Sequence, residues 1–131
     1  MRDPRPGLPW SRGRIERRSA YATYMDSPAW FARREAWYRA FVATDAAQPL
    51  CTACGVAWML DHGDLHHRTY GRLGSELNED LIPMCRQCHD ELHRVLEHNP
   101  VWRRMCRPQA TDLIVAGMAR RLTDGIGISG E

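Results

Sequence analysis

Apolar and polar positions change period several times along the chain, and the first clear stretch is helical. A stripe of aromatic residues repeats at helical spacing, and its members are Trp30, Phe31, Trp37, Tyr38 and Phe41. Ser27 is a typical helix cap and Pro28 suits a first helical position, so the pattern predicts a helix over about 28–43. The aromatic stripe is expected to face the core.

Shorter elements follow this helix. The segments VAWML at 56–60 and LHHRT at 65–69 flank a turn-like DHGD at 61–64, which together predict a β-hairpin. Residues 71–80 are rich in glycine and polar side chains and predict an ordered loop. A second helix should start near the CxxC pair at 85–88 and stop before Pro100, and a last one should cover about 111–122. The expected fold class is therefore α+β.

The amino-terminal segment has a different composition. Residues 1–19 contain three prolines, two glycines and six arginines without helical or strand periodicity. This composition predicts a flexible basic arm over 1–19, followed by a single domain over 20–125 and a short tail over 126–131.

Length and cysteine content narrow the class of protein. A chain of 131 residues fits one domain, and so small a core often needs a metal or disulfide to stabilise it. Four of the five cysteines form two CxxC pairs. With no apolar leader or bilayer-spanning run, we expect reduced cysteines, a cytoplasmic setting and no membrane partner.

Charge is unevenly distributed. Residues 1–40 hold nine arginines against four acidic residues, residues 41–99 hold four against nine, and residues 100–131 hold five against three. The basic ends predict contact with nucleic acid phosphates. The candidate arginines are Arg2, Arg5, Arg12, Arg14, Arg17, Arg18, Arg103, Arg104 and Arg107.

The two CxxC pairs predict a structural zinc site. Two thiolates of one CxxC knuckle can bind a single ion, and two pairs supply the four ligands of a tetrahedral site. These ligands are Cys51, Cys54, Cys85 and Cys88. The alternatives are unrelated reduced pairs or a redox CxxC, but neither pair sits at a typical redox turn.

Four histidines suggest a second metal site. His89 and His93 are four residues apart, so they share one face of the expected helix. His66 and His67 are adjacent at the end of a strand and should point to opposite faces, so that one can bind the ion while the other acts as a base. The alternative is a pair of incidental surface histidines beside a solvated helix face.

The segments CTAC, LHHRTYGRLGSE and DLIPMCRQCHDELH together resemble the HNH endonuclease family over about residues 51–97. The resemblance implies a small ββα-metal, treble-clef-like core stapled by a four-cysteine zinc, with flanking helices. Carried over by position, it implies that His67 is the general base and that His66, His89 and His93 bind the catalytic metal. Asp80 occupies the place of the family's Asn, which braces the loop; an ionised Asp can accept such hydrogen bonds but cannot donate them.

The resemblance further implies metal-dependent hydrolysis of DNA phosphodiester bonds by a bacterial or phage-encoded protein, with duplex DNA as the partner. Imidazole ligands favour Zn²⁺, Ni²⁺, Co²⁺ or Mn²⁺, and abundant Mg²⁺ can also serve. Two alternatives stay open at this point. One is a non-catalytic zinc module that binds nucleic acid or protein, and the other is a toxin-like nuclease domain.

Overall fold

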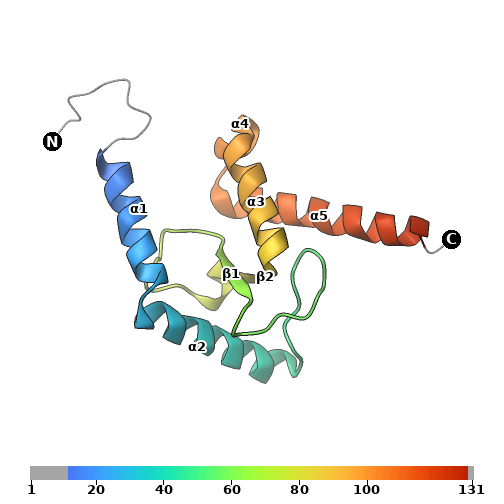
Figure 1. Cartoon of the computed structure of the whole chain (residues 1–131), viewed down its shortest axis with the longest axis horizontal. Helices are drawn as coiled ribbons and strands as arrows, with labels where there is room; N and C mark the ends of the chain where they lie inside the picture. Colours follow the sequence, from blue (N-terminus) through green and yellow to red (C-terminus); the bar gives the residue numbers. More distant parts are fainter. Residues whose placement is uncertain (1–11, 130–131) are drawn as a thin grey trace.

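A computed structural model describes residues 12–129, with side chains described over 18–123. Figure 1 shows a small sheet between helices. The element order is α1 (Arg12–Met25), α2 (Pro28–Asp45), β1 (Asp64–His67), the 3-10 turn η1 (Asn78–Asp80), β2 (Leu81–Met84), α3 (Arg86–His98), α4 (Pro100–Arg103) and α5 (Arg107–Ser129). The fold is therefore a mixture of helices with one two-stranded antiparallel sheet.

Helix α2 forms where the aromatic stripe predicts it. The Ser27 hydroxyl accepts a hydrogen bond from the backbone amide of Trp30 at 3.2 Å, and Pro28 occupies the first turn. The helix ends at Ala46, which adopts a left-handed conformation with a φ of 52°. Trp30 and Trp37 are buried as expected, whereas Phe31 is 59% exposed.

Strand pairing differs from the predicted hairpin. Strand β1 pairs with β2, in the register Asp64 to Met84 and His67 to Leu81, rather than with residues 56–60. The reason lies in Trp58, which is buried, packs on Trp37 with ring centroids 5.2 Å apart, and donates its indole N–H to the carbonyl of Asp64 at 2.7 Å. Residues 56–60 therefore fold back onto helix α2 instead of extending alongside β1.

The sheet separates two apolar clusters. On one side, Trp30, Trp37, Trp58, Leu65 and Leu81 form a tryptophan-rich core against α2. The other face packs on α3 and α5, through a core that includes Met84, Leu92, Leu96, Ile114 and Val115. Helices α2 and α3 thus lie on opposite sides of the strands (Figure 1). The neighbouring residues Leu81 and Ile82 of β2 contact different cores, as strand alternation requires.

Helices at both ends extend beyond the sequence expectation. Residues 12–19 lie in α1, although they were expected in the irregular arm, and the remainder of that arm, 1–11, lies outside the described residues. Tyr24 and Met25 of α1 pack against the tryptophan-rich core, and this tertiary contact explains a helix whose own sequence pattern is weak. Helix α5 likewise runs over Arg107–Ser129, beyond the expected 111–122 and into the expected tail.

Candidate metal centres

Four cysteines lie close together at the start of α3. Their Sγ atoms all lie within 4.8 Å of one another, and those of Cys54 and Cys85 are 3.8 Å apart. Zinc–sulfur bonds of about 2.3 Å in a tetrahedron place sulfurs about 3.8 Å apart. All four cysteines are free thiols, with Cys51 and Cys88 buried. The cluster is compatible with a structural metal such as zinc.

The backbone around the first knuckle favours a thiolate. Burial raises the pKa of the Cys51 thiol, but hydrogen bonds from the backbone amides of Cys54 and Cys85 outweigh burial and bring the pKa to about 7. Burial also raises the pKa of Cys54 and of Cys88. A bound cation would offset that cost, because the thiolate is the form that ligates metal.

Three histidines form a second cluster between the sheet and α3. His66 comes from β1, whereas His89 and His93 are one turn apart on α3. One ring nitrogen from each lies within 4.8 Å of the other two, and the Nε2 atoms of His89 and His93 are 3.0 Å apart. This geometry places three nitrogen donors around one point.

One buried nitrogen of the histidine cluster has no hydrogen-bond partner and could bind a metal ion. His66 is 0% exposed, and its Nε2 lies 3.1 Å from the Thr111 hydroxyl. Among the side chains described over 18–123, its Nδ1 is the one buried polar atom without a hydrogen-bond partner. A buried acceptor that makes no hydrogen bond destabilises the folded protein. When Nε2 donates to Thr111, the Nδ1 lone pair is free to bind an ion, so the donor set fits a divalent metal.

Carboxylates support the two helical histidines. Asp64 Oδ2 lies 2.9 Å from His89 Nδ1 and 3.0 Å from Arg86 Nε, and Glu97 Oε1 lies 3.8 Å from His93 Nδ1. An Nδ1–H donated to Asp64 leaves the His89 Nε2 lone pair facing the cluster. Carboxylates behind metal-binding histidines commonly orient the ring in this way.

Burial and nearby positive charge keep His66 and His93 neutral. Burial, aided by Arg107 and His89, lowers the pKa of His66 far below its usual range. Burial, aided by His89 and Arg107, lowers the pKa of His93 to about 4. Neutral imidazole is the form that binds metal, so both rings are ready to ligate at pH 7.

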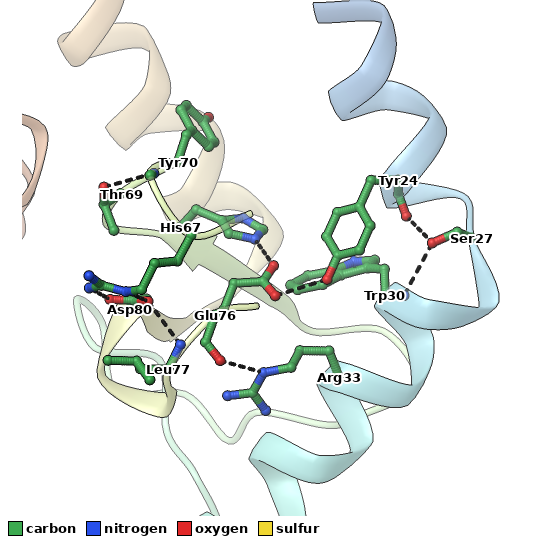
Figure 2. A network of polar contacts seen from close by, with 12 residues as sticks. Tyr24, Ser27, Trp30, Arg33, His67, Thr69, Tyr70, Glu76, Leu77 and Asp80 are labelled. Carbon is green, nitrogen blue, oxygen red and sulfur yellow. Dashed lines mark hydrogen bonds and ion pairs between the residues drawn. The ribbon is translucent and has the colours of Figure 1, made fainter. Parts of the chain in front are cut away.

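His67 points to the opposite face of β1, as strand alternation requires. Its Nε2 lies 2.8 Å from Glu76 Oε2, and its ring lies against Trp30 with centroids 4.8 Å apart (Figure 2). His67 is buried, with 2% of its surface exposed. Burial lowers the pKa of His67, and the hydrogen bond to Glu76 opposes that shift.

Asp80 braces the loop that joins the strands. Its Oδ2 accepts hydrogen bonds from Arg72 Nε at 2.8 Å and from the Leu77 amide at 2.9 Å. Its carbonyl accepts from the Arg68 amide at 2.7 Å, directly after His67. The aspartate therefore accepts hydrogen bonds from three different groups, and the described contacts of its carboxylate lie within the loop.

A cleft of about 690 Å³ opens beside the histidine cluster. His93 lines it together with Arg18, Tyr21, Tyr70 and Arg107, among others. Arg107 donates to the carbonyl of His67 at 2.9 Å and to the Tyr70 hydroxyl at 3.0 Å. The cleft thus gives solvent and ligands a route to the histidine cluster.

The remaining candidate arginines are spread more widely. Arg103 and Arg104 are exposed at the end of α4 and do not line the cleft. Arg12, Arg14 and Arg17 lie on α1 with side chains outside the described set, while Arg2 and Arg5 precede the described residues. Of the predicted arginines whose side chains are described, Arg18 and Arg107 line this cleft.

Three contributing residues were not predicted as part of the sites: Asp64, Glu76 and Thr111. The position of Asp64 carries a usable signal, since it lies two residues before His66 and so shares its face of a strand. Glu76 ends the LHHRTYGRLGSE segment, so the resemblance marks its position but not its contact with His67. Thr111 reaches His66 from α5, and sequence spacing carries no comparable signal for it.

None of the helices described is long and apolar enough to cross a membrane. Comparisons with family models, with curated proteins and with solved structures found no significant match to this chain.

Proposed function

We propose that this protein is a metal-dependent endonuclease of the HNH type, in which β1, β2 and α3 form a ββα-metal core. The supporting observations are the convergence of His66, His89 and His93 and the buried Nδ1 of His66, which has no hydrogen-bond partner. The adjacent His67 lies outside this cluster, with its Nε2 at Glu76. Three ligands together with a nearby unliganded base match the needs of phosphodiester hydrolysis.

The three histidines would hold the cation, and Asp64 would orient His89 behind it. A divalent cation bound there supplies Lewis-acid stabilisation of the charge that develops on the scissile phosphate. The cysteine cluster holds the knuckle against the start of α3, and its four ligands close that site to chemistry. In this proposal the zinc site maintains the fold and the histidine site serves the reaction.

His67 would act as the general base. Its Nε2 contacts Glu76, so Nδ1 is the ring nitrogen that would accept the proton. Nδ1 takes a proton from water while the water oxygen bonds to phosphorus and the bond to the 3′ oxygen breaks. The departing 3′ oxygen takes its proton from solvent. Base catalysis of this kind contributes about 10²–10⁴-fold in rate.

DNA would reach the site through the cleft. Arg107 and Arg18 line it and supply positive charge beside His93. Contacts from arginine to phosphate position the strand without reading its sequence. The exposed Arg103 and Arg104 extend the basic surface, and affinity should therefore fall as salt rises.

One observation favours a different function. His67 is 2% exposed, so a base buried under α1 and α2 must become accessible before water and phosphate reach it. A non-catalytic zinc-binding module, which binds nucleic acid or protein, would not require this access. The two functions predict opposite results in a cleavage assay.

The test is cleavage of supercoiled plasmid by the full-length protein with Zn²⁺, Ni²⁺, Co²⁺, Mn²⁺ or Mg²⁺, with and without chelator. His67→Gln is the informative variant, since it retains an N–H donor for the buried Glu76, and we expect its rate to fall about 10²–10⁴-fold. His62→Ala is the matched control, because His62 is exposed and ion-paired only with Asp61. Absence of cleavage with every ion, or equal cleavage by His67→Gln, would contradict the nuclease proposal.

A further inference from the structure

Glu76 is a buried carboxylate with both oxygens engaged. Its side chain is 0% exposed. Oε1 accepts a hydrogen bond from the Tyr24 hydroxyl at 2.9 Å, and Oε2 lies 2.8 Å from Nε2 of His67 (Figure 2). A buried carboxylate needs such partners, because an unpaired one costs several kcal/mol.

Two helices hold Glu76 in place. Tyr24 comes from the end of α1, and Arg33 of α2 donates its Nε–H to the Glu76 carbonyl at 3.0 Å. Figure 2 shows both side chains reaching the loop from the helical side, opposite His67. The position of the carboxylate relative to His67 is therefore fixed by elements on two sides rather than by the loop alone.

The donors and acceptors of this network determine which ring nitrogen carries the proton. Burial and the contact with Glu76 raise the pKa of Tyr24 to about 12, so its hydroxyl stays a donor. Burial raises the pKa of Glu76, but the hydrogen bonds from His67 and its other donors outweigh burial and leave the pKa below its usual value. An ionised carboxylate can only accept hydrogen bonds. His67 must then donate from Nε2, and its lone pair lies on Nδ1.

Aromatic packing fixes the plane of the same ring. Trp30 lies against His67 with an interplanar angle of 32°, and the ring of Tyr21 approaches edge-on with centroids 6.0 Å apart. Tyr21 and Tyr70 both border the ring of His67 and line the cleft. The ring is thus constrained both in rotation and in the hydrogen bond that it donates.

We propose that Glu76 is a positioning residue that holds His67 in the tautomer with the proton on Nε2 and the lone pair on Nδ1. This inference rests on the proposed nuclease function, in which Nδ1 takes the proton from water. Once Nδ1 is protonated, the ring becomes a cation, and the charge of Glu76 at Nε2 stabilises it. A carboxylate that orients a base in this way acts on the rate and not on substrate binding.

The decisive variant is Glu76→Gln, with Glu79→Gln as its control. Glutamine keeps the shape and can accept from Tyr24, but it turns an N–H group toward His67 and therefore favours the opposite tautomer. Glu79 lies three residues further along in η1 and is exposed, so its change to Gln removes the same charge without touching the histidine. Both variants should be compared with the zinc-loaded wild type.

The first readout is the tautomer itself, from the ¹⁵N shifts of His67 in long-range ¹H–¹⁵N NMR spectra. We expect protonated Nε2 in the wild type and in Glu79→Gln, and protonated Nδ1 in Glu76→Gln. Protonated Nδ1 in the wild type would overturn the inference, and this measurement needs no variant that might fail to fold.

The second readout is steady-state cleavage of DNA. Glu76→Gln should lower kcat by about 10²–10⁴-fold with KM little changed. If the wild type cuts DNA and Glu76→Gln cuts equally well, the role of Glu76 is overturned while the nuclease proposal stands. If the wild type fails to cut DNA with any of the ions, the nuclease proposal and the catalytic role of Glu76 fail together. The NMR result still decides whether His67 donates its Nε2 proton to Glu76.

Discussion

The cysteine cluster and the histidine cluster both draw ligands from α3, yet they differ in completeness. Four thiols surround one point and can fill a tetrahedron alone, whereas three imidazoles surround the other. The histidine cluster also borders the 690 Å³ cleft through His93. Open coordination is what separates catalytic from structural zinc sites, so the number of ligands and their access to solvent, rather than ligand type alone, distinguish the two clusters.

The clusters are also supported differently. The first cysteine knuckle is held by the backbone, with the Cys51 amide donating to Val56 at 2.8 Å and the Thr52 amide donating to Pro83 at 2.9 Å. The histidines are oriented by side chains, notably Asp64 and Thr111. A site held by the backbone should fail only when the fold fails, whereas a site held by side chains can lose its metal while the fold persists.

The largest expected effect is unfolding of the protein when a ligand of the cysteine site is removed. Cys51→Ser removes a buried ligand, and the binding energy of a structural zinc is also folding energy, about 10–16 kcal/mol in small zinc domains. We expect loss of cooperative thermal unfolding by circular dichroism together with loss of zinc. Cys106→Ser is the control, because Cys106 is exposed and belongs to neither cluster. A native-like melt for Cys51→Ser would show that the clusters do not differ in this way.

An intermediate effect is expected at the histidine site. His89→Ala removes one of three ligands, so affinity at this site should fall by more than the roughly 10–100-fold seen when a supporting partner is lost. Metal titration should show the loss, while the cysteine-bound zinc and the fold remain. His98→Ala, an exposed position at the end of the same helix, should titrate like the wild type. If His89→Ala unfolds, the histidine cluster is required for the fold, and the expected difference between the two clusters is wrong.

The smallest effect is expected at the loop brace. Asp80→Asn loses an acceptor for charged and backbone donors, which should lower the free energy of unfolding by about 1–3 kcal/mol in denaturant titrations. Arg72 holds the pKa of Asp80 below its usual value. Because the folded pKa is lowered, the stabilisation is complete above pH of about 4 and is lost as pH falls through the folded pKa. The difference between Asp80→Asn and wild type should therefore shrink in acid, and a constant difference would contradict this account.

Local patterns predicted α2 and α3 well, because Ser27, Pro28 and Pro100 are strong start and stop signals. The same reasoning failed for residues 56–60, where an apolar run was taken for a strand. Trp58 buries itself against Trp37, and that gain depends on a helix far away in sequence. The true partner of β1, the segment Leu81–Met84, lies beyond the loop, so short-range turn signals could not identify it.

The order of residues already tells which donors are available and how they are spaced: two CxxC pairs, two histidines one helical turn apart, and two adjacent on a strand. Spacing within one element sets the direction in which side chains point, because helices and strands have fixed periods. The packing of separate elements brings His66 to α3 and Thr111, and His67 to Glu76 and Trp30. These contacts join residues from separate elements, and their free energy comes from burial that exists only once the chain has folded.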